Sequence, residues 1–124
     1  MRILVVEDEA DLNLLLCKVL TRAGYTVDGC MDGEEAELHL MGAEYDGILL
    51  DVMLPKLDGF GVCELIRRQS RVPIILLTAL DGEAEQLRGF DLEIDDYVTK
   101  PFSMPVLLRK IGAVLRRVSG AAGG

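Results

Sequence analysis

The stretch "YDGILLDVMLP", residues 45–55, decides the fold class of this chain and raises the question of its function. Its apolar run, Ile48, Leu49 and Leu50, is typical of a strand that is buried on both faces of a parallel sheet. The run ends on a carboxylate, Asp51. Burying an ionised carboxylate is costly unless a cation or a metal ion compensates its charge. The rest of the sequence must therefore explain why a buried strand ends on an acid.

Length and composition indicate a single soluble globular domain. The chain has 124 residues, of which 50% are hydrophobic and 27% are charged. No apolar run approaches the ~20 residues that span a bilayer. Acids follow "MRILVV" too early for the apolar core of a signal peptide. We therefore expect a cytoplasmic protein without a membrane partner.

Charge and cysteine content exclude several classes of partner. The net charge of −8 argues against direct binding to nucleic acid, because neutralising phosphates requires clustered Lys and Arg. The C-terminal "RKIGAVLRR" is too short and too apolar to act as a basic patch. Cys17, Cys30 and Cys63 lack the spacing of a metal site, so we interpret them as core or near-surface thiols in a reducing compartment.

Short apolar runs alternate with longer amphipathic ones along the chain. The predicted strands are residues 2–6, 25–30, 46–51, 73–79 and 96–100. The predicted helices are residues 10–24, 33–41, 59–69, 82–92 and 104–118. This alternation predicts an α/β fold, a three-layer sandwich in which helices cover both faces of a five-stranded parallel sheet.

Two boundaries follow from the same patterns. In helix 10–24 we expect one stripe to face the sheet and Gly24 to end the helix. That stripe consists of Leu12, Leu15, Leu16, Val19 and Leu20. The domain is predicted to cover residues 1–118, and "SGAAGG", residues 119–124, is expected to be a flexible tail or the start of a linker.

Polar residues stand at the carboxyl ends of four predicted strands. They are Glu7 and Asp8 after the first strand, Asp51 on the third, Thr78 on the fourth and Lys100 on the fifth, and Ala79 and Pro101 directly follow Thr78 and Lys100. In open α/β sheets, ligands bind outside these strand ends. Each residue alone has an ordinary explanation, such as a turn or a helix cap. Their convergence on one edge of the sheet indicates a functional site.

The chemistry of these groups favours phosphoryl transfer. Three carboxylates repel one another unless a cation compensates them, and all-oxygen donors suit Mg²⁺, or Mn²⁺, better than zinc or copper. Lys100 and Thr78 would suit the oxygens of a phosphoryl group, and Asp51 can be the nucleophile that accepts it. The single histidine, His39, lies on a predicted helix and is not a candidate phosphohistidine. We therefore expect the chain to receive phosphoryl groups rather than to donate them.

Four motifs in this order resemble the receiver domain of bacterial two-component response regulators, most closely that of the winged-helix transcription-factor subfamily. The motifs are "ILVVEDEAD", "ILLDVMLPKLDGF", "PIILLTA" and "DDYVTKPF", and the resemblance covers residues 2 to about 118. It implies a flavodoxin-like, doubly wound sheet with strand order 2-1-3-4-5. It also implies a signalling domain phosphorylated by a sensor histidine kinase. Such a domain is not an enzyme beyond its own phosphotransfer and autodephosphorylation.

The resemblance assigns roles to the matching residues. Asp51 would be the phosphoacceptor. Asp8 would bind Mg²⁺ directly, Glu7 would act largely through water, and Met53 would contribute its backbone carbonyl. These assignments account for the acid at the end of the apolar run.

The resemblance also implies a conformational switch. Thr78 would hydrogen-bond the phosphoryl group and Lys100 would pair with it, while Ala79 and Pro101 complete the phosphoryl-binding set. The Lys100–Pro101 peptide bond is expected to be cis. Tyr97 would turn inward with Thr78 on phosphorylation, and helix 82–92 would be the mobile element.

The subfamily further implies a homodimer of the phosphorylated form through helix 82–92, strand 96–100 and helix 104–118. Gln86 and Val106 stand where the subfamily usually has a charged pair. The remaining ion pairs would come from Asp95, Asp96, Lys110 and Arg117. Because ion pairs at the rim of an interface set specificity more than affinity, we expect dimerisation to persist with altered partner discrimination.

A second departure concerns Glu93 and Ile94, which replace the Gly-Ala that usually precedes "DDY". If that glycine serves a positive φ, Glu93 carries strain or the turn differs. The subfamily also suggests transcription control through a DNA-binding domain that would follow residue 118.

Three other hypotheses compete with this interpretation. A phosphatase of the haloacid-dehalogenase type would carry a second acid two residues after its nucleophile, where this chain has Met53. A nucleotide-binding module would need a glycine-rich turn after the first strand, where this chain has "EDEAD". A receiver-like interaction module that works without phosphorylation remains compatible with the sequence.

Overall fold

A computed structural model describes residues 1–52, 59–78 and 94–123, without the side chains of residues 59–60 and 118–123. The strands are β1 (Arg2–Val6), β2 (Thr26–Cys30), β3 (Gly47–Asp51), β4 (Ile74–Thr78) and β5 (Asp96–Thr99). The helices are α1 (Ala10–Arg22), α2 (Gly33–Gly42), α3 (Gly59–Gln69) and α5 (Met104–Gly123). None of the helices in the described residues combines the length and the apolar character needed to cross a bilayer.

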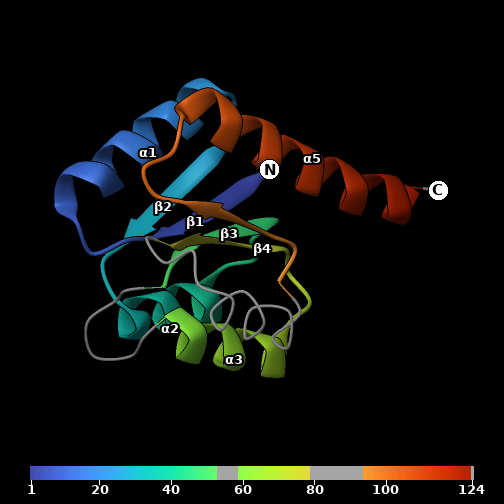
Figure 1. The fold of residues 1–124 in the computed structure, drawn as a ribbon. Coiled ribbons are helices and arrows are strands. Elements are labelled where there is room, and N and C mark those ends of the chain that lie inside the picture. The colour runs from blue at the N-terminus through green and yellow to red at the C-terminus, as the bar shows by residue number, and fades with distance from the viewer. Residues whose placement is uncertain (53–58, 79–93, 124) are drawn as a thin grey trace.

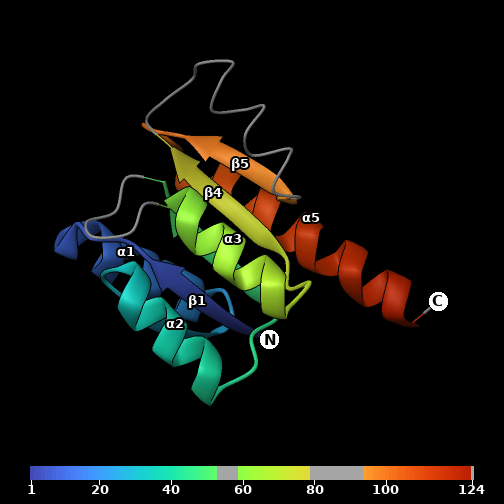
Figure 2. The same cartoon turned by 90° about the horizontal axis from the view of Figure 1, so that it is seen from below.

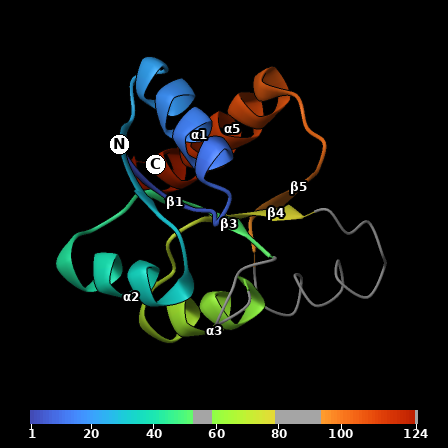
Figure 3. The same cartoon turned by 90° about the vertical axis from the view of Figure 1, so that its left-hand side faces the viewer.

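The strands form one parallel sheet in the order β2-β1-β3-β4-β5, as the resemblance implied. Helices α1 and α5 cover one face of the sheet, and α2 and α3 cover the other (Figure 1). The view turned about the vertical axis shows the three layers (Figure 3), and the view from below shows α2 and α3 in front of the sheet (Figure 2). The predicted three-layer α/β sandwich is therefore confirmed.

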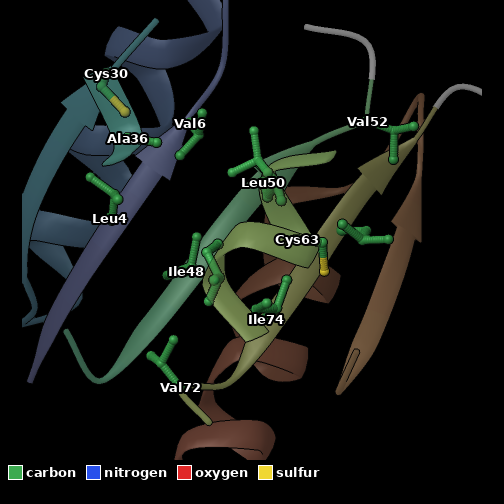
Figure 4. Packing of buried hydrophobic residues seen from close by; sticks show 13 residues of the cluster. Leu4, Val6, Cys30, Ala36, Ile48, Leu50, Val52, Cys63, Val72 and Ile74 are labelled. Atoms are coloured by element: carbon green, nitrogen blue, oxygen red, sulfur yellow. The ribbon is translucent and has the colours of Figure 1, made fainter. Parts of the chain in front are cut away.

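Two hydrophobic cores lie on opposite faces of the sheet because side chains alternate along each strand. The α2–α3 core consists of Leu4, Val6, Cys30, Ala36, Ile48, Leu50, Val52, Val62, Cys63, Ile66, Val72, Ile74 and Leu76 (Figure 4). The α1–α5 core consists of Ile3, Val5, Leu16, Leu20, Leu49, Ile75, Leu77, Val98, Leu107, Ile111, Val114 and Leu115. All five residues of β3 and of β4 are buried, as the continuous apolar runs predicted.

Local signals in the sequence explain where two of the helices begin and end. Gly24 has a φ of 104° directly after the Ala23 cap of α1, a backbone conformation that glycine adopts without a steric penalty. Asp32 caps α2 by accepting a hydrogen bond from the Glu35 backbone N–H at 2.9 Å. In return, the Glu35 carboxylate accepts from the Met31 N–H at 2.7 Å, a reciprocal arrangement similar to a capping box.

One expectation about the stripe of α1 is wrong, because Leu15 is 46% exposed. Leu16 and Leu20 are buried as expected, Leu12 and Val19 are half-buried, and Asn13 joins the buried residues. The Asn13 amide has hydrogen-bond partners beneath the helix, as described below. Helix α5 is longer than the expected 104–118 and ends at Gly123, while the assignment of residues 119–124 to a tail or linker stays a prediction. Once a helix is formed, each added residue contributes a backbone hydrogen bond without needing new packing.

The remaining expected elements lie within one residue or two of their observed bounds. The predicted helix 82–92, with Gln86, lies outside the described residues, as does Glu93. Ile94 is described, and its half-buried side chain packs against the α2–α3 core. Cys30 and Cys63 are buried and Cys17 is half-buried, and all three are free thiols, as expected.

Candidate functional site

The polar residues at the strand ends come together because the strands are parallel and their ends are in register. Asp51 is paired with Leu77 on β4, and Thr78 is paired with Thr99 on β5. Glu7 follows β1 directly, and its N–H donates to the carbonyl of Cys30, the last residue of β2, at 3.1 Å. Lys100 follows β5, and its N–H donates to the carbonyl of Thr78 at 2.7 Å. All of these residues therefore stand at the carboxyl edge of the sheet.

Strand alternation explains why three of the charged side chains meet on one side of this edge. Glu7, Asp51 and Lys100 each stand two residues beyond a member of the α1–α5 core, namely Val5, Leu49 and Val98. Side chains two residues apart in an extended strand share a face. Thr78 is in phase with Leu76 instead, so it belongs to the α2–α3 face.

The acids form a compact cluster at this edge. One carboxylate oxygen from each of Glu7, Asp8 and Asp51 lies within 4.8 Å of the others. Glu7 is fully buried, Asp51 is 2% exposed, and Asp8 is exposed to solvent. Burial raises the pKa of Glu7 to about 7, and the adjacent Asp51 carboxylate acts in the same direction. Near neutral pH the folded protein therefore holds a proton in this cluster part of the time.

The Lys100 ammonium forms ion pairs with both buried carboxylates, Asp51 and Glu7. Its Nζ lies 2.7 Å from Oδ2 of Asp51 and 3.1 Å from Oε1 of Glu7. Burial acts to lower the pKa of Lys100, but its hydrogen bonds to Asp51 and Glu7 outweigh that effect and raise it. The lysine is consequently a positive charge held beside Asp51.

The donor set fits a hard divalent cation. Three carboxylates, one of them fully buried and one exposed, provide oxygen ligands together with access from solvent. Mg²⁺ is commonly held by one or two carboxylates and retains several waters. Burial, together with the adjacent Asp51 carboxylate, raises the pKa of Glu7 even though Lys100 lies beside both acids. Glu7, Asp8 and Asp51 are therefore chemically suited to hold such an ion.

The residues expected to act as a switch, Thr78 and Tyr97, both lie on the α2–α3 face of the sheet. Thr78 is 5% exposed at the end of β4. Tyr97 is half-buried against the α2–α3 core and is paired with Leu76, so it lies on the same face of the sheet as Thr78. The Nζ of Lys110 lies 5.7 Å from the centre of the Tyr97 ring, a cation–π contact, and donates to the Tyr97 carbonyl at 3.1 Å. The Lys100–Pro101 peptide bond is cis, as expected.

Two residues expected at the site, Met53 and Ala79, lie outside the described residues. The positions expected on a dimer face make ion pairs within the chain. Asp95 pairs with Arg67 at 3.4 Å, and Asp96 pairs with Lys110 at 3.5 Å. Arg117 is exposed near the end of α5, and Val106, 46% exposed, lies near its start.

The sequence patterns missed Asn13, which lies directly behind the acids. Its amide nitrogen donates to the backbone carbonyls of Glu7 and Cys30, both at 2.9 Å. The signals that could have revealed it are a polar residue within an apolar helical pattern and a glycine, Gly29, inside a strand. Neither signal is specific without the fold.

Comparisons with known proteins agree with this geometry. A family model described as the response regulator receiver domain matches residues 3–112. The chain is 50% identical over 122 residues to the probable transcriptional regulator ycf27 of Guillardia theta, covering 98% of this chain and 48% of that protein. It is 47% identical over 118 residues to the transcriptional regulatory protein TcrA of Mycobacterium tuberculosis, covering 94% and 46%.

Solved structures show the same fold. A two-component response regulator from Clostridium difficile superposes with a TM-score of 0.92 at 30% identity, covering 95% of this chain and 98% of that one. The BeF₃-activated N-terminal receiver domain of Klebsiella pneumoniae RstA superposes with a TM-score of 0.88 at 32% identity, covering 94% and 99%.

The matches cover nearly all of this chain but only part of the curated relatives. This chain spans about half the length of the curated relatives it matches, so it corresponds to one part of those proteins. The family model, in contrast, accounts for most of the chain, and the strand order and the acidic strand ends agree with it. The chain belongs to the response regulator receiver domain family.

Proposed function

We propose that this chain is the phosphoacceptor of a two-component system and that Asp51 receives the phosphoryl group from a sensor histidine kinase. The observation that carries the proposal is the placement of a 2% exposed carboxylate at the sheet edge, 2.7 Å from the Lys100 ammonium and beside two further acids. A buried strand has no structural need for such a charge, and burying it is costly. A carboxylate that acts as a nucleophile, in contrast, must be held in one position, and burial beside Lys100 holds it there.

The reaction is a displacement at phosphorus. A carboxylate oxygen of Asp51 attacks the phosphorus in line with the bond from phosphorus to the donor histidine nitrogen. That bond breaks as the new oxygen–phosphorus bond forms, and its electron pair stays on the imidazole nitrogen. The Lys100 ammonium, which neutralises Asp51 beforehand, then pairs with a phosphoryl oxygen, and the Thr78 hydroxyl donates to another. The chemistry is confined to the domain's own phosphorylation and later dephosphorylation.

Glu7, Asp8 and Asp51 would hold Mg²⁺, or Mn²⁺, with the Met53 carbonyl as a further ligand that lies outside the described residues. When bound, the ion supplies positive charge that reduces the repulsion between carboxylate and phosphoryl oxygens. The protein's own part is to keep the acids together at the strand ends. The all-oxygen donor set, with three carboxylate oxygens within 4.8 Å of one another, supports this assignment.

Phosphorylation is proposed to act through a shift of conformation. Thr78 and Tyr97 share a face of the sheet, which supports a coupled movement of the two side chains. The relatives are named as transcriptional regulators, which supports control of transcription as the output. Asp96 and Lys110, which pair with each other at 3.5 Å within this chain, are proposed to contribute ion pairs between copies of a homodimer. Sedimentation of the phosphorylated protein tests this, and a strict monomer would contradict it.

The phosphoacceptor is tested by intact-mass spectrometry after incubation with acetyl phosphate or phosphoramidate and Mg²⁺. We expect an adduct of ~80 Da that is absent in Asp51→Asn. The matched control is Asp46→Asn, an exposed acid that precedes the same strand and accepts a hydrogen bond from the Arg2 N–H. This control should still form the adduct. No adduct in the wild type, or one that survives Asp51→Asn, would refute the proposal and favour an interaction module that works without phosphorylation.

A further inference from the structure

Asn13 is a buried amide on the sheet-facing side of α1, near the start of the helix. It is 8% exposed and lies in the same stripe as Leu16 and Leu20. A buried amide is costly unless its polar atoms are hydrogen-bonded. Here the nitrogen donates to two backbone carbonyls at 2.9 Å, and Oδ1 accepts from the Cys17 thiol at 3.5 Å. Both polar atoms of the side chain are therefore satisfied.

The two carbonyls that Asn13 holds belong to Glu7 and Cys30, at the ends of neighbouring strands. The Glu7 N–H already donates to the Cys30 carbonyl at 3.1 Å. Two residues after Cys30 the chain reaches Asp32, which caps α2. The Glu7 carbonyl is bonded instead by the Asn13 amide. Because a peptide unit is planar, fixing the carbonyl of Glu7 also fixes the N–H of Asp8. Asn13 thus orients the peptide that joins the two acids.

Gly29 on β2 provides an independent sign that this amide is closely fitted. A Cβ at Gly29 would lie 2.6 Å from Oδ1 of Asn13 and 3.0 Å from Sγ of Cys17. A glycine inside a strand weakens the strand and often marks the close approach of another group. The strand therefore lacks a side chain at a position where a Cβ would collide with the Asn13 amide.

We infer that Asn13 is a positioning residue. It holds the peptide between Glu7 and Asp8 and thereby sets the affinity of the acid cluster for a divalent cation, without contacting the cation or the phosphoryl group. The inference rests on the proposed function, since it requires that Glu7 and Asp8 hold the ion. Groups that orient metal ligands typically change metal affinity by about 10- to 100-fold when they are removed.

The test measures Mn²⁺ binding to the unphosphorylated protein, with the free ion counted by electron paramagnetic resonance. Asn13→Leu keeps the size of the side chain and removes both donors. The control Leu20→Ala opens a cavity under the same helix without touching the Glu7–Asp8 peptide. We expect Asn13→Leu to bind Mn²⁺ at least about 10-fold more weakly and Leu20→Ala to stay within about twofold of the wild type. At saturating Mn²⁺ the phosphorylation rate of Asn13→Leu should recover.

A second variant covers the case in which Asn13→Leu fails to fold. Gly29→Ala places a Cβ 2.6 Å from Oδ1 of Asn13 and so displaces the same amide while leaving its N–H donors in place, and it should also weaken Mn²⁺ binding. The inference would be overturned if folded Asn13→Leu bound Mn²⁺ within about twofold of the wild-type affinity. If Asn13→Leu is unfolded, the same result in Gly29→Ala would overturn it. So would an equal loss in Leu20→Ala. Wild-type protein that binds no Mn²⁺, or Asp8→Asn that binds normally, would instead refute the metal site itself, and the inference with it.

Discussion

Replacing Lys100 with methionine removes the ammonium that lies between two buried carboxylates while keeping a side chain of similar length. The Nζ atom lies 2.7 Å from Asp51 and 3.1 Å from Glu7, whose side chains are 2% and 0% exposed. Removing one partner of a buried ion pair typically costs about 3–5 kcal/mol. Because the lysine side chain itself is 24% exposed, we expect the lower end, about 3 kcal/mol at neutral pH without metal.

Urea denaturation in EDTA measures this loss. With a slope of about 1.5 kcal/mol/M for a domain of this size, the midpoint should fall by about 2 M. The cost should shrink at about pH 5, because Glu7, whose pKa is raised to about 7, is then protonated and no longer needs a cation. The control is Lys110→Met, which removes a half-exposed lysine 3.5 Å from Asp96 and should cost at most about 1 kcal/mol.

Two results would refute this reasoning. A midpoint that falls by less than about 0.5 M with an unchanged slope would mean that the buried acids do not depend on Lys100 for compensation. Equal losses in Lys100→Met and Lys110→Met would mean that burial of the partners does not determine the cost. Either result would contradict the electrostatic account of the site.

Two further predictions concern the acid cluster and the orientation of α1. In EDTA, the raised pKa of Glu7 contributes stability that is complete below about pH 4.5 and is lost as the pH rises through about 7, because the folded state keeps the proton longer than the unfolded chain does. The unfolding free energy of Glu7→Gln should therefore lack this component, and a pH profile parallel to that of the wild type would contradict it. Leu16→Ala should cost about 2–5 kcal/mol because Leu16 is fully buried, whereas Leu15→Ala should stay within about 1 kcal/mol. Comparable losses in thermal or urea denaturation would show that Leu15 does belong to the core.

Much of the fold could be predicted because its signals are local. Continuous apolar runs mark β1, β3 and β4, and amphipathic runs of helical length separate them. A strand followed by a helix and then another parallel strand leaves few topologies. The polar strand ends could be placed on one edge for the same reason, since parallel strands all end on the same side of a sheet.

Local patterns were insufficient where side-chain orientation depends on distant partners. The apolar residues of α1 did not reveal that Asn13 lies in the buried stripe, where its amide donates to the carbonyls of Glu7 and Cys30. Asp95 and Asp96 pair with Arg67 and Lys110 of their own chain, and their pairing between copies stays a prediction. Both outcomes depend on long-range contacts that no window of sequence contains.

The sequence by itself determined the family, the sheet with its helices on both faces, and the set of residues at the carboxyl edge, because each is encoded in a contiguous motif. Only the tertiary structure decided how those residues relate to one another. It showed that Glu7, Asp51 and Lys100 are in phase on one face while Thr78 is on the other, that Lys100 bonds both buried acids, and that Asn13 lies behind them. The physical reason is that motifs record residue identity and spacing, whereas distances and burial arise only when strand register and helix rotation bring separate motifs into contact.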